Sequence, residues 1–183
     1  CPRCGTTLSN FEVSQGYKDI QDIAVTVKLE LVDEPGTYLL AWTTTPWTLP
    51  GNMAAAVNVD FEYVKVSLNG SKYFLAKERV KVLPEGYEVL ETIEGNKLVG
   101  KKYKPPFGYF FDKNIENKEN AWKVYAAPYV TLEDGTGIVH LAPAFGEEDL
   151  LLAKEKKIPV VHHVDQNGRF TAEVKDFAGE LVK

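Results

Sequence analysis

Residues 41–52, AWTTTPWTLPGN, decide what kind of fold this sequence encodes and where its chemistry lies. β-branched threonine favours an extended chain, and a proline keeps the residue before it, here Thr45, out of the helical region. The stretch therefore predicts a strand that ends abruptly and leaves a run of hydroxyl groups beside Trp47. An ordinary strand end would also explain it, so the threonine run is not a site by itself.

The flanking sequence predicts a mostly β protein. Apolar and polar residues alternate through 24–31, which indicates a strand with one solvated face. Asn69-Gly70 is the dipeptide that suits a type I′ turn, and it predicts a hairpin between 61–68 and 71–76. Further strands are expected at 38–45, 87–93, 123–127 and 137–142, and a second hairpin at 159–164 with 169–171.

Helical patterns are few. Residues 147–157 have acidic side chains in the first turn and lysines in the last, as the helix dipole favours, and 76–82 carry a weaker helical pattern. Residues 105–120 are irregular, with a Pro-Pro start, and predict a long loop. The fold class expected is mostly β with a few short α-helices (α+β), arranged as a closed or nearly closed β-barrel.

Composition limits the function classes. The chain has 183 residues, of which 44% are hydrophobic, and this suits one globular domain. No apolar run is long enough to cross a bilayer and no signal-peptide pattern is present. Because the net charge is −5, nucleic acid could bind only local lysine patches such as 101–104 or 154–157, which are equally explained as solvated surface.

The two cysteines, Cys1 and Cys4, form half of a zinc-binding motif. A structural zinc site needs four ligands, and His162 and His163 would point to opposite faces of a strand. The chain also starts on a cysteine without a methionine, which favours excision from a larger protein. We therefore expect no cofactor here, with zinc bound only if a second cysteine pair outside the chain supplies it, a connecting segment at 1–20, and the main domain at 21–183. Nothing indicates disulfide chemistry, which predicts a reducing cytoplasm.

A second motif lies at 133–150, EDGTGIVHLAPAFGEEDL. A glycine-rich turn leads into an apolar strand with His140, a proline ends the strand, and Asp149 falls in the first turn of the next helix. No nucleophile elbow, phosphate loop or zinc-protease motif accompanies it. Taken singly, His140 reads as a hydrogen-bonded core histidine and the acids as helix-dipole partners.

The order of the two motifs, about ninety residues apart, resembles the editing (CP1) domain inserted in isoleucyl-tRNA synthetase. The N-terminal CPRCGTTLSNFEV resembles the segment that leads into that insertion, so the resemblance covers essentially the whole chain. Related valyl and leucyl domains usually carry arginine after the threonines and Ala-His-Asp near the second motif. Here Pro46-Trp47 and 144–146 (Ala-Phe-Gly) stand instead, which favours the isoleucyl member.

The resemblance implies hydrolysis of the ester in valine-charged tRNA(Ile), in a pocket too small for isoleucine. One methylene is worth only about 1–3 kcal/mol in a binding pocket, and the isoleucyl enzyme is itself the standard example of that limit. Asp149 would bind the α-ammonium and stay ionised at its helix start, His140 would line the side-chain pocket, and the threonines would hold the adenosine and orient a water. The implied catalytic set is Asp149, His140, Thr43, Thr44 and Thr45, and the implied substrate contacts are Trp47, Thr48, Asn52, Gly137, Ala144 and Phe145.

The implied partners are the acceptor end of tRNA(Ile) and the rest of a parent synthetase, with no membrane and a monomeric state. Two alternatives stay open. One is a module that binds the tRNA end without hydrolysis, and the other is a domain of valyl or leucyl type that edits another amino acid. Clearance of Val-AMP in the same pocket is also open.

Overall fold

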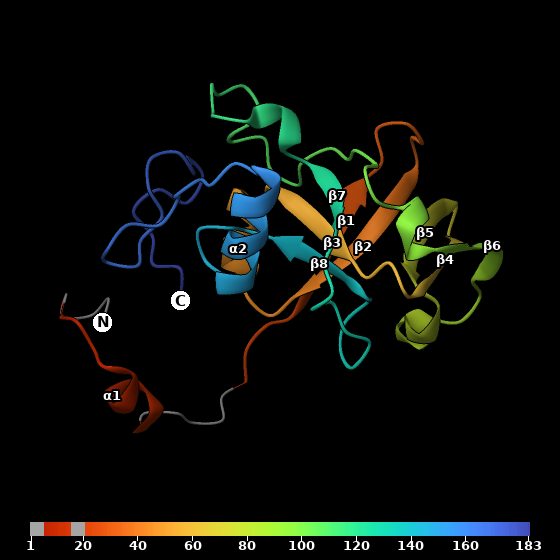
Figure 1. Ribbon diagram of the computed structural model, residues 1–183, viewed down its shortest axis with the longest axis horizontal. Coiled ribbons are helices and arrows are strands. Elements are labelled where there is room, and N and C mark those ends of the chain that lie inside the picture. The colour runs from red at the N-terminus through yellow and green to blue at the C-terminus, as the bar shows by residue number, and fades with distance from the viewer. Residues whose placement is uncertain (1–5, 16–20) are drawn as a thin grey trace.

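The threonine run begins at the end of β2 (Thr37–Thr43). In the computed structural model β2 is the central strand of the sheet, paired with β1, β5 and β8 (Figure 1). The structure describes residues 6–15 and 21–183. The other strands are β1 (Val25–Glu30), β3 (Ala54–Val57), β4 (Glu62–Leu68), β5 (Ser71–Ala76), β6 (Glu88–Glu94), β7 (Lys123–Ala126) and β8 (Ile138–Leu141). The α-helices are α1 (Asn10–Gln15) and α2 (Glu147–Lys156), and 3₁₀ helices cover Pro46–Gly51, Lys77–Val82, Gly95–Lys97 and Lys118–Asn120.

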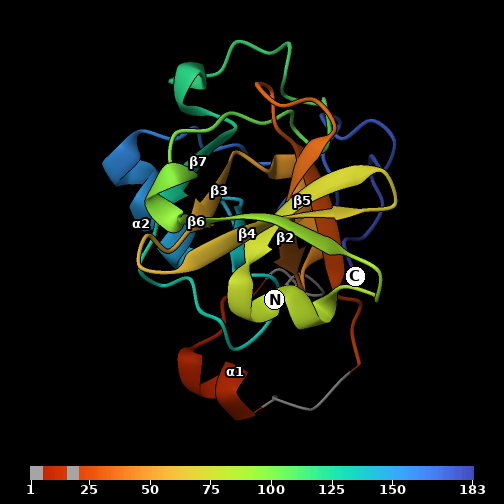
Figure 2. The same cartoon turned by 90° about the vertical axis from the view of Figure 1, so that its right-hand side faces the viewer.

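The sheet divides at β2. One edge of β2 pairs antiparallel with β1 along its whole length. The other edge is shared, because its first half pairs parallel with β5 and its second half parallel with β8, where Trp42 lies opposite Val139. From there one branch runs β5-β4-β6 and the other β8-β3-β7. Figure 2 shows the first branch curving over β2, so that the whole sheet forms a curled half-barrel around the core.

The centre of the second branch is β3, Ala-Ala-Ala-Val, which sequence patterning did not predict. Both faces of β3 are fully buried, so the strand shows no alternation of polar and apolar residues. Alanine is also a poor strand former, which removes the second signal. Its small side chains let β3 sit between β7 and β8 inside the main core cluster.

Most of the expected elements are confirmed. The strands at 24–31, 38–45, 87–93, 123–127 and 137–142 are present as β1, β2, β6, β7 and β8 with ends shifted by a residue or two, and the helix at 147–157 is α2. The hairpin at 61–76 is present as β4 and β5, and Asn69 and Gly70 both have the positive φ of a type I′ turn. The mostly β class therefore holds, and the barrel takes the form of an open, curled sheet.

Two expectations need correction. The hairpin at 159–164 with 169–171 is shorter than expected: the antiparallel bridge from Val164 to Phe170 is flanked by two backbone hydrogen bonds, Asp165 N–H to the Arg169 carbonyl at 2.8 Å and Thr171 N–H to the His163 carbonyl at 3.0 Å. The residues before this bridge form no strand, and Val161 and His163 are buried. The helix at 76–82 is a 3₁₀ helix, Lys77–Val82, and the 3₁₀ helix Pro46–Gly51 after the threonines was not predicted.

The zinc half-motif at Cys1 and Cys4 lies outside the described residues, so zinc binding there stays a prediction. Within 6–15 and 21–183 no three His, Cys, Asp or Glu side chains are grouped as a metal site would need. In the same residues no helix is long and apolar enough to span a membrane.

The type I′ turn gives a matched test of the fold. Gly70 has φ +77, whereas Gly108 has no positive φ, and a methyl group at either glycine would meet no neighbouring atom. Gly70→Ala should lower the free energy of unfolding by about 1–2 kcal/mol, because an L residue is strained in the left-handed region. Gly108→Ala should be neutral or slightly stabilising. Urea denaturation of both variants measures the difference, and equal stabilities would contradict the turn.

Candidate active site

A pocket of about 290 Å³ lies where β2 and β8 end and α2 begins. β2 and β8 run parallel, so the loops that follow them emerge at the same edge of the sheet. This brings together the two sequence motifs, which are otherwise far apart in the chain. The lining residues are Trp42, Thr43, Thr44, Thr45, Thr48, Val139, His140, Ala142, Phe145, Gly146 and Asp149.

The three threonines have different surroundings. Thr43 is buried, and its hydroxyl accepts the Thr45 backbone N–H at 3.1 Å, while the two hydroxyls lie 3.3 Å apart. These bonds fold the chain sharply at the strand end and so shape the turn. Thr44 is exposed at the rim, and no hydrogen bond within the described residues uses its hydroxyl. Of the three, Thr44 therefore has the hydroxyl that is free for a ligand.

His140 is held from both sides of its ring. The Thr48 hydroxyl donates to the Thr45 carbonyl at 2.7 Å, so its oxygen is left to accept from His140 Nε2 at 2.8 Å. Nδ1 then carries no proton and faces the Asn52 amide nitrogen at 3.4 Å. The network sets one neutral tautomer. Burial lowers the pKa of His140 to about 4, with a smaller contribution from His163, so the ring is uncharged at neutral pH.

Asn52 orients this histidine from outside the pocket. Its amide nitrogen also donates to the Ala54 carbonyl at 2.9 Å, and its amide oxygen accepts the Tyr103 hydroxyl at 2.8 Å. Asn52 is therefore fully bonded and 2% exposed. A side chain in that state supports His140 and does not contact a ligand directly.

Among the described residues that line the pocket, Asp149 alone has a carboxylate, lysine or arginine side chain. Oδ2 accepts the Ala142 backbone N–H at 2.9 Å, and Oδ1 lies 3.5 Å from the Tyr129 hydroxyl. No described lysine, arginine or histidine forms an ion pair with it. Burial raises the pKa of Asp149 and outweighs these hydrogen bonds, which act in the opposite direction. The helix start alone was expected to favour the ionised form, and the loss of water proves to be the larger effect.

Gly146 brings this carboxylate close to the backbone. A Cβ on Gly146 would lie 3.2 Å from the Asp149 carboxyl carbon, closer than most side chains tolerate. A glycine before α2 thus leaves the room that Asp149 occupies. The sequence showed the glycine but gave no sign of this contact.

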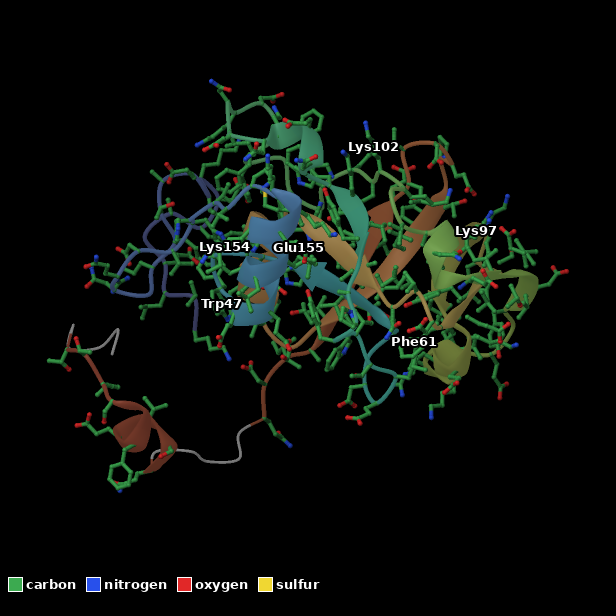
Figure 3. All side chains as sticks on the ribbon, in the orientation of Figure 1. Trp47, Phe61, Lys97, Lys102, Lys154 and Glu155 are labelled. Carbon is green, nitrogen blue, oxygen red and sulfur yellow. The ribbon has the colours of Figure 1, made fainter. Side chains whose placement is uncertain are left out.

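The structure separates the expected site residues into two groups. Thr43, Thr44, Thr45, Thr48, His140, Phe145 and Asp149 line the pocket together. Trp47, Asn52, Gly137 and Ala144 lie outside its lining. Trp47 lies beside α2 in Figure 3 and packs on Phe145 from behind, with 5.3 Å between ring centroids. Gly137 serves the core, because its carbonyl accepts the Tyr63 hydroxyl at 2.8 Å.

Four lining residues were missed: Trp42, Val139, Ala142 and Gly146. Trp42 and Val139 are paired across β2 and β8, so their places follow from strand pairing. Strand alternation from Thr44 could have suggested Trp42, and the pairing of Trp42 with Val139 then places Val139 beside it, but only once the two strands were known to be neighbours.

In comparisons with known proteins, the whole chain is similar to a segment of isoleucine–tRNA ligases. No protein-family model matches it. It is 46% identical over 184 residues to the isoleucine–tRNA ligase of Bacillus thuringiensis (strain Al Hakam), and 46% identical over 183 residues to that of Clostridium acetobutylicum. Each match covers 100% of this chain but 17% of the ligase, so the chain spans about a sixth of these relatives.

Solved structures share the fold. The crystal structure of GlLeuRS-CP1, a leucyl-tRNA synthetase CP1 domain, has a TM-score of 0.59 at 18% identity, covering 73% of this chain and 59% of that one. The P. falciparum cytosolic leucyl-tRNA synthetase editing domain has a TM-score of 0.50 at 17% identity, covering 66% of this chain and 47% of its own. At these identities the likeness concerns architecture alone.

The buried histidine predicts acid sensitivity. The folded pKa of His140 is about 4 and the ordinary value is 6.5, so the unfolded chain takes up a proton first as pH falls between them. The free energy of unfolding should therefore drop by about 1.4 kcal/mol per pH unit in that window, on the order of 3 kcal/mol in all. Urea denaturation between pH 7 and pH 4 measures this loss.

A pair of variants isolates that contribution. His140→Asn removes one titrating ring and should reduce the slope, whatever its stability at pH 7. The remaining slope is expected from His163, because burial lowers the pKa of that ring too. His162→Asn changes an exposed neighbour of the buried His163 and should keep the wild-type slope. A His140→Asn profile parallel to wild type would mean that another group causes the acid sensitivity.

Proposed function

We propose that this chain, which is related along its full length to a segment of the isoleucine–tRNA ligases and has the fold of a synthetase editing domain, hydrolyses the ester between valine and tRNA(Ile). One observation carries the proposal most directly. The Asp149 carboxylate faces a small pocket, half-buried, with no cation beside it in the described residues. A buried carboxylate without a counter-ion is costly, and an aminoacyl ester supplies an α-ammonium to pair with it.

The remaining lining suits a small aliphatic side chain. Val139, Ala142, Phe145 and Trp42 present apolar surface, and His140 is neutral there. Both ring nitrogens of His140 are already bonded to Thr48 and Asn52, so the ring has no free site for proton transfer. We therefore assign His140 to the wall that limits side-chain size, and remove it from the catalytic set that the resemblance implied.

The reaction then proceeds by positioning. An aminoacyl ester is already activated, so an oriented water can attack its carbonyl without a covalent enzyme intermediate. The described lining residues include no cysteine or serine, and the hydroxyls of Thr43 and Thr48 form hydrogen bonds within the protein. Thr44 at the rim has the hydroxyl that can hold the ribose or the water. The water oxygen bonds to the carbonyl carbon and the bond from that carbon to the ribose oxygen breaks. One water proton goes to the ribose oxygen, which leaves as a hydroxyl, and the other is released to solvent as the valine carboxylate forms.

The tRNA itself must be held elsewhere. Among the described residues that line the pocket there is no lysine or arginine to pair with phosphates. This agrees with a chain that spans about a sixth of its relatives, in which further binding surface is available. We propose that the pocket recognises the aminoacyl end and that other surfaces recognise the tRNA body.

Deacylation assays with matched variants test the carboxylate. Wild-type protein should hydrolyse Val-tRNA(Ile) faster than Ile-tRNA(Ile). Asp149→Asn should lose more than tenfold in kcat/KM for Val-tRNA, because a hydrogen bond between charged groups contributes about 1.5–3 kcal/mol. Glu148→Gln removes an exposed carboxylate from the same helical turn and should stay within threefold of wild type.

Two outcomes would count against the proposal. Equal rates on Val-tRNA and Ile-tRNA would remove the size-selective pocket. Full activity of Asp149→Asn would remove the ammonium contact. A third outcome is that aminoacylated tRNA binds but is not hydrolysed, both by the chain alone and by the full-length synthetase that contains it. This outcome would favour a binding module.

Isosteric substitutions distinguish the roles of Thr43 and Thr44. Thr44→Val should lower kcat for Val-tRNA without changing the melting temperature, because the Thr44 hydroxyl makes no described bond. Thr43→Val should destabilise the protein by about 1 kcal/mol, since it removes the acceptor for the Thr45 N–H. Thermal melts and single-turnover deacylation of both variants provide the comparison. The reverse pattern would exchange the two roles.

A further inference from the structure

The pocket wall at Phe145 depends on a residue that does not touch the pocket. Phe145 lies in the loop between β8 and α2 and lines the cavity. Two rings contact it edge to face: Trp47, at 5.3 Å and 76° between ring planes, and His163, at 4.7 Å and 72°. Neither of these rings belongs to the lining. The position of Phe145 is therefore set from behind.

His163 is fixed against the turn that carries the threonine motif. Its ring is 0% exposed, and Nε2 lies 3.0 Å from the Trp47 carbonyl oxygen. A carbonyl can only accept, so Nε2 donates its hydrogen there. The ring also lies against Gly51, where an added Cβ would be 2.4 Å from Nδ1. A side chain at Gly51 would push this histidine away.

Packing alone does not account for a histidine in this place. Nδ1 is buried and has no hydrogen-bond partner among the described residues, which a phenylalanine of similar shape would avoid. What a histidine supplies and a phenylalanine lacks is the hydrogen bond to Trp47. That bond ties the ring to the 3₁₀ helix Pro46–Gly51, which also contains Thr48, the partner of His140.

His163 therefore lies between two walls of the pocket, the threonine turn and Phe145. On one side of His163 lies the turn with Thr48, and on the other lies Phe145. Phe170 stacks on His163 at 6.0 Å and 15°, and Phe177 packs on Phe170 at 5.7 Å. The rings of this cluster other than Trp47 and Phe145 come from 163–177, in and after the short hairpin around the Val164–Phe170 bridge.

We propose that His163 is a positioning residue that sets the width of the amino-acid pocket, and thereby its discrimination between valine and isoleucine. The hydrogen bond to Trp47 fixes the ring relative to the threonine turn, and the ring fixes Phe145. This inference rests on the proposed deacylase function for its substrate. The geometry on which it depends, Phe145 held between Trp47 and His163, stands without that function.

The test compares three variants of the chain. His163→Ala should let Phe145 move back, raise kcat/KM for Ile-tRNA(Ile), and lower the Val-to-Ile ratio more than tenfold, while kcat for Val-tRNA stays within threefold of wild type. His163→Phe keeps a ring but loses the bond to Trp47, and should give an intermediate ratio. Phe177→Leu alters the outer cluster without touching Phe145 and should leave the ratio unchanged.

The outcomes separate the two proposals. Equal losses on both substrates in folded His163→Ala, with an unchanged ratio, would make His163 a core residue only and overturn the inference. If the wild-type chain hydrolyses neither substrate, the proposed function fails. The affinities of amide-linked valyl-adenosine and isoleucyl-adenosine, and the place of Phe145 in a crystal structure of His163→Ala, then decide the width argument. If Phe145 has not moved in that structure, the width argument is refuted. If His163→Ala does not fold, the same comparison is made with His163→Phe.

Discussion

The parallel pairing of β2 with β8 is the constraint on which the rest of the structure depends. It is a single register, Trp42 opposite Val139, at the point where β2 leaves β5 and takes a new neighbour. Because parallel strands end at the same edge, the chain must turn there twice, once through the threonines and once through 142–146. Both turns close on one hollow, and α2 starts beside it with Asp149 in its first turn.

Loss of water acts on the two ionisable groups of this hollow in opposite directions. It lowers the pKa of His140 and raises the pKa of Asp149. His140 stays neutral, and its two ring nitrogens form hydrogen bonds with Thr48 and Asn52. The carboxylate has hydrogen bonds but no counter-ion in the described residues. In this pocket the hydrogen-bonding groups of His140 are all satisfied within the protein, whereas Asp149 has no counter-ion in the described part of the chain. A cationic ligand would supply that counter-ion.

The relatives and the neighbours support different parts of this account. Isoleucine–tRNA ligases match the chain at 46% identity along its full length, which relates its motifs to theirs. The solved editing domains match the architecture at 17–18% identity, and architecture alone does not specify chemistry. The proposed function depends on the contacts of Asp149 and His140 and on the hydroxyl of Thr44, which forms no hydrogen bond within the described residues. Behind them, the Trp47 and His163 rings lie outside the pocket lining and pack against Phe145, which lines it.

Local patterns were sufficient for the strands with alternating faces, for the Asn69-Gly70 turn and for α2, because each leaves a signal within a few residues. The resemblance carried by the motif pair also implied that these two stretches meet, and both line the pocket. Strand β3 left no such signal, since it is buried on both faces. The surroundings of Thr44, Asn52 and His163 were decided only by tertiary structure. Each depends on which partner takes its hydrogen bonds or packs on its ring, and those partners are brought near by the fold, from as far as 116 residues along the chain.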